Sequence, residues 1–138
     1  MRLLVTILFG MMAVETASLA AEPVMPIGQL LVSPSSVHRK VFKLEGVVKN
    51  AAAYSGSEFR TNQPLCGADF DLEDYSGTIA VLYHVRCQSG GQKAFVVDDG
   101  MHLVIDGYME APPDVQRYSN GKDFGVRFVA LSVASLRR

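Results

Sequence analysis

The sequence predicts an all-β fold of five short strands, with a short N-terminal helix. Two observations predict it. Apolar and polar residues alternate in several short runs, which is the period of a half-buried strand. Two of these runs, 42–48 and 103–109, also carry a glycine at the same place, 61 residues apart. Glycine inside a strand marks a bend or bulge, so two strands that bend at matched points indicate a small closed barrel.

The composition fits one folded domain. The chain has 138 residues, 49% of them hydrophobic, which is too apolar for a disordered protein and enough for one core. It carries 13 basic and 14 acidic residues, so the basic excess of a typical duplex-DNA-binding protein is missing.

The first twenty residues resemble a secretory signal peptide. Arg2 provides a positive charge, and residues 3–14 form an apolar run that is too short to span a bilayer. Small residues at Ser18 and Ala20 predict cleavage after Ala20, and no cysteine that could be lipidated follows. We therefore expect residues 1–20 to be a signal peptide and the mature chain to be periplasmic or secreted, with no membrane span.

The mature chain divides into a packing segment at 21–39 and a barrel domain at 40–138. Pro26–Val32 predicts a short helix, and Ser33-Pro34 predicts a break or a fresh helix start. The first strand is expected at 42–48, the fourth at 103–109 and the fifth at 124–130, after an Asn-Gly turn signal. Long connections are expected at about 50–65 and 110–123.

Residues 70–85 predict a β-hairpin, because two alternating runs flank Ser76-Gly77. If Ser76-Gly77 is a two-residue turn, Phe70 faces Tyr83, Leu72 faces Val81, and Cys66 faces Cys87. Cys66 and Cys87 then form a non-hydrogen-bonded pair, whose short Cα separation suits a disulfide. An exported chain with two cysteines also favours one disulfide, so both arguments predict the Cys66–Cys87 bond.

The same register assigns each side chain of the hairpin to a face. The face expected to fill the barrel carries Ala68, Phe70, Leu72, Ile79, Val81, Tyr83 and Val85. The opposite face carries Asp69, Asp71 and Glu73 with Leu82, His84 and Arg86. Three carboxylates on that face would repel a phosphate backbone.

Five strands, the two glycine-bearing strands and the motif F-x-L-x-D-x-S-G-x-I-x-V from Phe70 to Val81 resemble an OB-fold. The similarity is to the small exported bacterial OB-fold (BOF) proteins and the tRNA-anticodon-type OB group, over about residues 40–133. It implies a five-stranded OB-fold Greek-key barrel and a periplasmic binding module. In such barrels the strand 2–3 face and two loops are the usual ligand surface.

Candidate binding residues follow from this expectation, since aromatic and cationic side chains occur in both predicted long connections. These loop residues are Tyr54, Phe59, Arg60, Arg117, Tyr118 and Lys122. Aromatic planes stack on rings of a ligand and cations contact its acidic groups. The sequence leaves open whether these loops or the strand face carries the site, and also whether Tyr54 and Phe59 only anchor their loop.

No catalytic motif is present in the sequence, and neither a metal site nor a cofactor is expected. The G-x-S-x-G, H-E-x-x-H and phosphate-loop patterns are missing. His84 and Asp69 are expected opposite each other, but two ligands make a weak metal site. Haem chaperones of this fold carry a C-terminal histidine motif, whereas residues 133–138 contain no histidine.

Three functions remain from the sequence. The favoured one is a non-enzymatic exported module for a peptide, glycan or protein partner. The second is a single-stranded nucleic-acid binder, which the fold allows and the acidic strand face disfavours. The third is a nuclease-like OB enzyme built on Asp69, Asp71 and Arg86.

We predict that the mature protein begins near Ala21 and has no free thiol. The intact mass should be lower than that of the full sequence by the mass of about twenty residues, and alkylation without prior reduction should not increase it. The bond should stabilise the fold by about 3 kcal/mol, because it constrains the unfolded chain. Two alkylated cysteines in the unreduced protein would contradict the disulfide.

Overall fold

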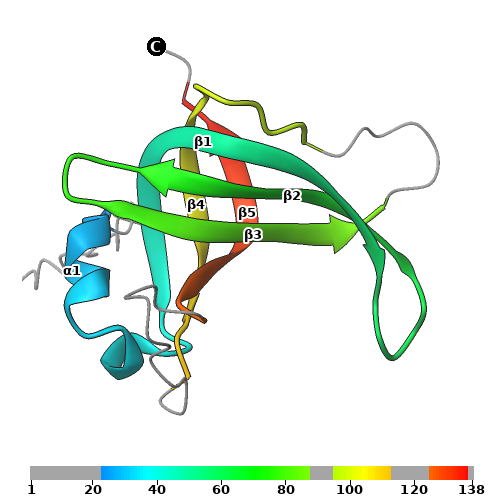
Figure 1. The fold of residues 1–138 in the computed structure, drawn as a ribbon, viewed down its shortest axis with the longest axis horizontal. Helices are drawn as coiled ribbons and strands as arrows, with labels where there is room; N and C mark the ends of the chain where they lie inside the picture. The colour runs from blue at the N-terminus through cyan, green and yellow to red at the C-terminus, as the bar shows by residue number, and fades with distance from the viewer. Residues whose placement is uncertain (1–22, 88–94, 113–124, 137–138) are drawn as a thin grey trace, which may run out of the picture.

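A computed structural model describes residues 23–87, 95–112 and 125–136, and strands in these ranges close into a barrel (Figure 1). The helical elements are α1 (Ile27–Val32) and the 3₁₀ helix η1 (Pro34–Val37). The strands are β1 (Val41–Ser57), β2 (Pro64–Glu73), β3 (Thr78–Arg86), β4 (His102–Glu110) and β5 (Arg127–Ser135). The five-stranded closed barrel predicted from the sequence is confirmed.

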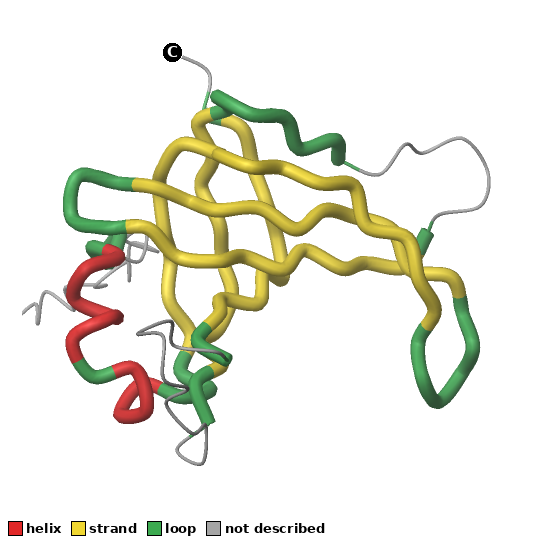
Figure 2. The backbone as a smooth tube through the Cα atoms, viewed as in Figure 1, coloured by secondary structure: helices red, strands yellow, loops and turns green. Residues whose placement is uncertain are grey.

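The strands follow the order β1-β2-β3-β5-β4 around the barrel, and β4 then pairs with β1. Every pairing is antiparallel except that of β3 with β5, where Val81 lies opposite Phe128. This parallel contact is short, and it joins two hairpin-like units into one closed sheet. Figure 2 shows the strands curving around a single interior, with the two helices at one end.

β1 closes the barrel because it pairs with two neighbours in succession. Its residues 41–47 pair with β4, and its residues 47–57 pair with β2. The change of partner occurs beside Gly46, where a Cβ would lie 2.5 Å from the carbonyl oxygen of Glu73. Gly107 of β4 is equally confined, because a Cβ there would overlap the carbonyl oxygen of Val129, and the β4–β5 register shifts at this residue. Close backbone approach is thus found at both matched glycines, but the irregularity of β1 lies between Lys49 and Ala52 rather than at Gly46, so the expected match of the two bends holds only in part.

The core is apolar and fills the barrel. All the side chains that the hairpin pattern assigns to the interior are buried except Val85, which is half-buried. Leu44, Val48, Leu103, Ile105, Met109 and Phe128 join them from the other strands. Ile27 and Leu30 of α1 are also buried in this cluster, so the helix covers one end of the barrel with its apolar side.

The predicted register of the β2–β3 hairpin is wrong by two residues. Glu73 lies opposite Thr78, Phe70 opposite Val81 and Leu72 opposite Ile79. The turn therefore has four residues, Asp74–Gly77. Its length comes from Asp74, whose carboxylate accepts hydrogen bonds from the Ser76 and Gly77 amides and from the Ser76 hydroxyl. Aspartate commonly closes turns in this way.

The Cys66–Cys87 disulfide is present although the register that supported it is wrong. Cys66 lies opposite Val85, and the Cys87 amide donates to the carbonyl of Pro64, so the bond joins diagonal positions. The Cα atoms are 5.0 Å apart, which is within the usual range. A shift of two residues keeps every side chain on its face, so both cysteines still share the inward face.

The strands also differ from their predicted bounds. The chain at 50–57, expected in a long connection, continues β1 and pairs with residues 64–69 of β2. This part of the hairpin extends beyond the barrel (Figure 1), so it shows no alternation of buried and polar residues. The fifth strand, expected at 124–130, is Arg127–Ser135. Its last residues are mostly exposed and gave no strand pattern for the same reason.

The β2–β3 turn holds the N-terminus of α1. The Ile27 amide donates to the Asp74 carboxylate at 2.9 Å, and the Gly28 amide donates to the Ser76 hydroxyl at 2.8 Å. These amides begin the helix and have no partner within it, so the turn acts as its cap. Burial raises the pKa of Asp74, but hydrogen bonds from Ile27, Ser76 and Gly77 outweigh it and lower the pKa below the ordinary aspartate value of 3.8.

Residues 1–20, the predicted signal peptide, lie outside the described residues. Among the residues that are described, no helix has the length and apolar character needed to cross a membrane.

We predict that Asp74→Ala lowers the free energy of unfolding by about 1–3 kcal/mol, because it removes the cap of α1 and the turn bonds together. Since the pKa of Asp74 is lowered in the folded protein, its contribution is present above about pH 4 and is lost as pH falls below that value. Urea unfolding at pH 7 and pH 3 measures both effects.

The matched control is Asp106→Ala, which removes an exposed carboxylate that is 3.7 Å from Lys43. Its effect at pH 7 should stay below about 0.5 kcal/mol. Equal losses for the two variants would show that Asp74 does not hold the turn and helix together.

Candidate functional site

The sheet of β1, β2 and β3 presents a polar surface on the side away from the core. We call it the outer face. Its side chains include Val47, Lys49, Ala52, Tyr54, Asp69, Asp71, Glu73, Ala80, Leu82, His84 and Arg86. The hairpin pattern assigned the β2 and β3 members correctly, whereas β1 adds residues that were expected in a loop.

Each of the three carboxylates on the outer face has a partner. Lys49 Nζ donates to Glu73 at 2.8 Å, and the Asn50 amide donates to Asp71 at 3.0 Å. His84 Nε2 lies 2.6 Å from Asp69 Oδ1, and these two residues are diagonal neighbours rather than the opposed pair expected. Lys49 and Asn50 belong to β1 but lie beyond the predicted end of this strand at Val48, so the sequence did not indicate their part in this surface.

An aromatic stack lies in the middle of the outer face. Tyr54 of β1 and His84 of β3 both lie opposite Gly67 of β2. Because Gly67 has no side chain, the two rings meet above it, with centroids 3.5 Å apart and planes 10° from parallel. The Asp69 carboxylate bonds the same histidine, so the orientation of the ring is held from two directions.

Gly67 is required by its surroundings. Its φ is +141°, which side-chain-bearing residues rarely adopt, and a Cβ would overlap the carbonyl oxygen of Tyr83. The glycine therefore allows β3 to approach closely and leaves room for the stack. A glycine between Cys66 and Ala68, inside an otherwise regular strand, is the sequence signal that could have located this site.

The outer face continues into the β1–β2 loop at residues 58–63. The Glu58 amide and carbonyl bond Gln63 and Asn62, which closes the loop, and the Glu58 carboxylate lies 3.7 Å from Arg86. Phe59 is fully exposed at this loop, and Arg60 beside it is also exposed. A fully exposed phenylalanine places apolar surface in water and is therefore available to a partner.

The structure places only some of the predicted loop residues as expected. Phe59 and Arg60 are in a loop, as expected, but Tyr54 lies within β1, because the strand continues through the expected connection. Arg117, Tyr118 and Lys122 lie outside the described residues, so their part in the site stays a prediction.

A groove of about 490 Å³ adjoins the outer face where β1 bends. Glu45, Lys49, Glu73, Tyr75 and His102 are among the residues that line it, and His102 lies 3.2 Å from Glu45. Within the described ranges, no group of three or more metal-ligating side chains is close enough to hold an ion.

The solved structures include a domain with the same architecture. The second OB-fold domain of replication protein A from Methanococcus maripaludis superposes with a TM-score of 0.54 over 84% of this chain and 97% of that chain, at 17% identity. The barrel is an OB-fold. At this identity the likeness shows the fold alone. No protein-family model matches the chain, and no curated protein matches its sequence.

We predict that Gly67→Ala lowers the free energy of unfolding by about 2–5 kcal/mol, through backbone strain and overlap with Tyr83. Gly100→Ala is the control, because Gly100 also has a positive φ, +84°, but no atom within 4 Å of its Cβ position. That variant should lose only about 1 kcal/mol from strain. Equal urea midpoints would argue against a close approach at Gly67.

Proposed function

We propose that this protein is an exported, non-enzymatic OB-fold module that binds a peptide, glycan or protein partner on the outer face and the β1–β2 loop. The observation that carries the proposal is the Tyr54–His84 stack, which is flanked by hydrogen-bonded carboxylates. Aromatic planes beside oriented polar groups are suited to sugars and to peptide side chains. In OB-folds this face and the adjacent loops are the common ligand surface.

The charge of this surface supports a neutral or cationic partner. The outer face and loop carry four carboxylates, at Glu58, Asp69, Asp71 and Glu73. Against them stand three permanent cations, at Lys49, Arg60 and Arg86. Lys49 and Arg86 already face carboxylates, which leaves little positive charge to attract a chain of phosphates.

Export is supported by the disulfide, because such bonds persist in oxidising compartments. It is supported independently by the apolar run at 3–14 and the small residues before Ala21. The disulfide joins Cys66 of β2 to Cys87 after β3, and Cys66 is next to Gly67, the residue that lies opposite Tyr54 of β1.

A single-stranded nucleic acid is the second candidate. It is favoured by the exposed Phe59, the Tyr54–His84 stack and the nearby Arg60, since bases stack on such rings. The nuclease-like alternative has less support. Asp71 bonds Asn50, Asp69 bonds His84 and Arg86 lies against Glu58, so each of the three side chains already has a partner within the protein.

We predict that Phe59→Ala and Tyr54→Ala each weaken binding of the partner by about 1–3 kcal/mol, which is roughly a 5- to 150-fold loss of affinity. Asp71→Asn should change affinity less, because the amide can still bond Asn50. Val32→Ala is the control, since Val32 is an exposed apolar residue of α1 that belongs neither to the outer face nor to the groove beside it. The mature protein would be screened against a glycan array, a panel of basic peptides and single-stranded oligonucleotides.

The outcomes separate the candidates. Binding to a glycan or peptide that changes little between 50 and 300 mM salt supports the proposal. Tight binding to oligonucleotides that falls steeply with salt favours the second candidate instead. Normal binding by both aromatic variants, with loss in Asp71→Asn, would contradict the aromatic site.

A further inference from the structure

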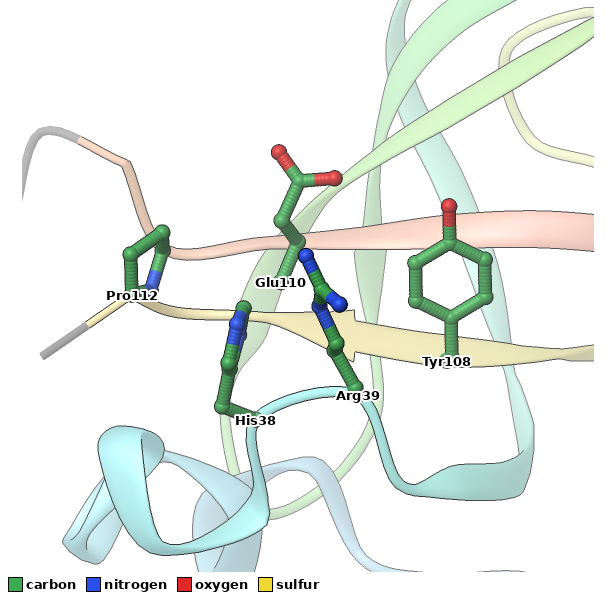
Figure 3. A pocket seen from close by; sticks show the side chains of 5 residues that line it. All are labelled: His38, Arg39, Tyr108, Glu110 and Pro112. Carbon is green, nitrogen blue, oxygen red and sulfur yellow. The ribbon is translucent and has the colours of Figure 1, made fainter.

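A second cavity lies away from the outer face, between the segment that precedes β1 and the end of β4. Its volume is about 630 Å³, within the range of small-molecule sites. His38, Arg39, Tyr108, Glu110 and Pro112 line it. Figure 3 shows the side chains of His38, Arg39, Tyr108 and Glu110 projecting to the same side.

Arg39 is held in an unusual backbone conformation. Its φ is +63°, a region that few residues other than glycine and asparagine adopt. The Arg39 amide donates to the Met109 carbonyl, and the Met109 amide donates to the Lys40 carbonyl, so β4 fixes this bend. None of the ion pairs among the described residues includes Arg39. Arg39 lines the cavity, and no carboxylate among the described residues pairs with its charge.

His38 has a defined hydrogen-bonding role. The Ala111 amide donates to His38 Nδ1 at 3.0 Å, which requires that this nitrogen carries no proton. In the neutral ring the proton is then on Nε2, which becomes a donor. His38 thus adds a second donor beside Arg39.

The acidic residue of the cavity is already neutralised. Arg127 binds Glu110 through Nε, at 2.7 Å, and through Nη2. Both nitrogens contact the same oxygen, Oε1, and the charges of the two side chains compensate each other. Among the described lining residues, the Arg39 charge is therefore left without a balancing carboxylate, with the Tyr108 hydroxyl as a further polar group and the Tyr108 and Pro112 rings as apolar walls.

We propose that this cavity binds a small organic oxyanion, a carboxylate or phosphate monoester with a ring-sized apolar body. The Arg39 guanidinium and the His38 Nε2–H bind the charged oxygens, Tyr108 donates its hydroxyl, and Pro112 contacts the body. The site is independent of the outer face, because the two share no residue.

The test uses benzoate and phenyl phosphate as probes and benzamide as the uncharged match, titrated into the ¹⁵N-labelled mature protein. Either anion should shift the Ala111 amide, which bonds His38, and the Arg39 Nε signal. Benzamide should bind at least tenfold more weakly. Arg39→Asn removes the guanidinium with a residue that tolerates positive φ, so it should melt at the wild-type temperature or above and bind at least tenfold more weakly.

Two further variants complete the design. Tyr108→Phe should weaken binding of both anions by about three- to tenfold, since it removes only the hydroxyl. Arg86→Gln removes the same charge from the outer face and should leave anion binding unchanged. The proposal is overturned if neither anion shifts these signals at 20 mM, if benzamide binds equally well, or if a folded Arg39→Asn variant keeps wild-type affinity.

Discussion

The double pairing of β1 is the constraint on which the rest of the structure depends. One strand bonds β4 with its first part and β2 with its second, so it must turn sharply where the two pairings meet, at Val47. Gly46 makes that turn feasible, because any side chain there would meet the backbone of Glu73. Without the turn the sheet would stay open, and the interior side chains would face water. Within the barrel, closure also removes the exposed sheet edges that invite association with other chains.

Glycines also decide where side chains meet. Gly107 brings β5 close to β4 on the far side of the barrel, and Gly67 opens the space in which Tyr54 and His84 stack. The outer part of the β1–β2–β3 sheet, which carries this stack, has few buried side chains beneath it. It is held by its backbone ladder, by the Cys66–Cys87 bond and by the pairs that join Lys49 and Asn50 to β2. Exposed pairs of this kind contribute little stability, so their main effect is to orient the polar groups.

The two candidate sites differ in chemistry because different elements build them. The outer face is a broad sheet surface with aromatic and acidic groups, suited to an extended partner. The second cavity presents the cationic side chain of Arg39, and it depends on the bend at this residue before β1. The N-terminal segment is hydrogen-bonded to the barrel at two places. Asp74 in the β2–β3 turn holds the start of α1, and Arg39 beyond η1 is bonded to β4. Both ends of this segment are therefore fixed to the barrel.

The sequence by itself determined the strands with one buried face and the residues on each face, since burial on one side imposes a period of two. It also predicted the disulfide, because the two cysteines share a face in either register. Only the tertiary structure decided the pairing itself, since Asp74 also bonds the distant Ile27 amide, and its hydrogen bonds lengthen the turn without altering the pattern. The outer part of β1, the stack over Gly67 and the cavity at Arg39 likewise depend on contacts between distant segments. These segments do not bury one face against the core, so their sequences show no alternation of apolar and polar residues that would have predicted them.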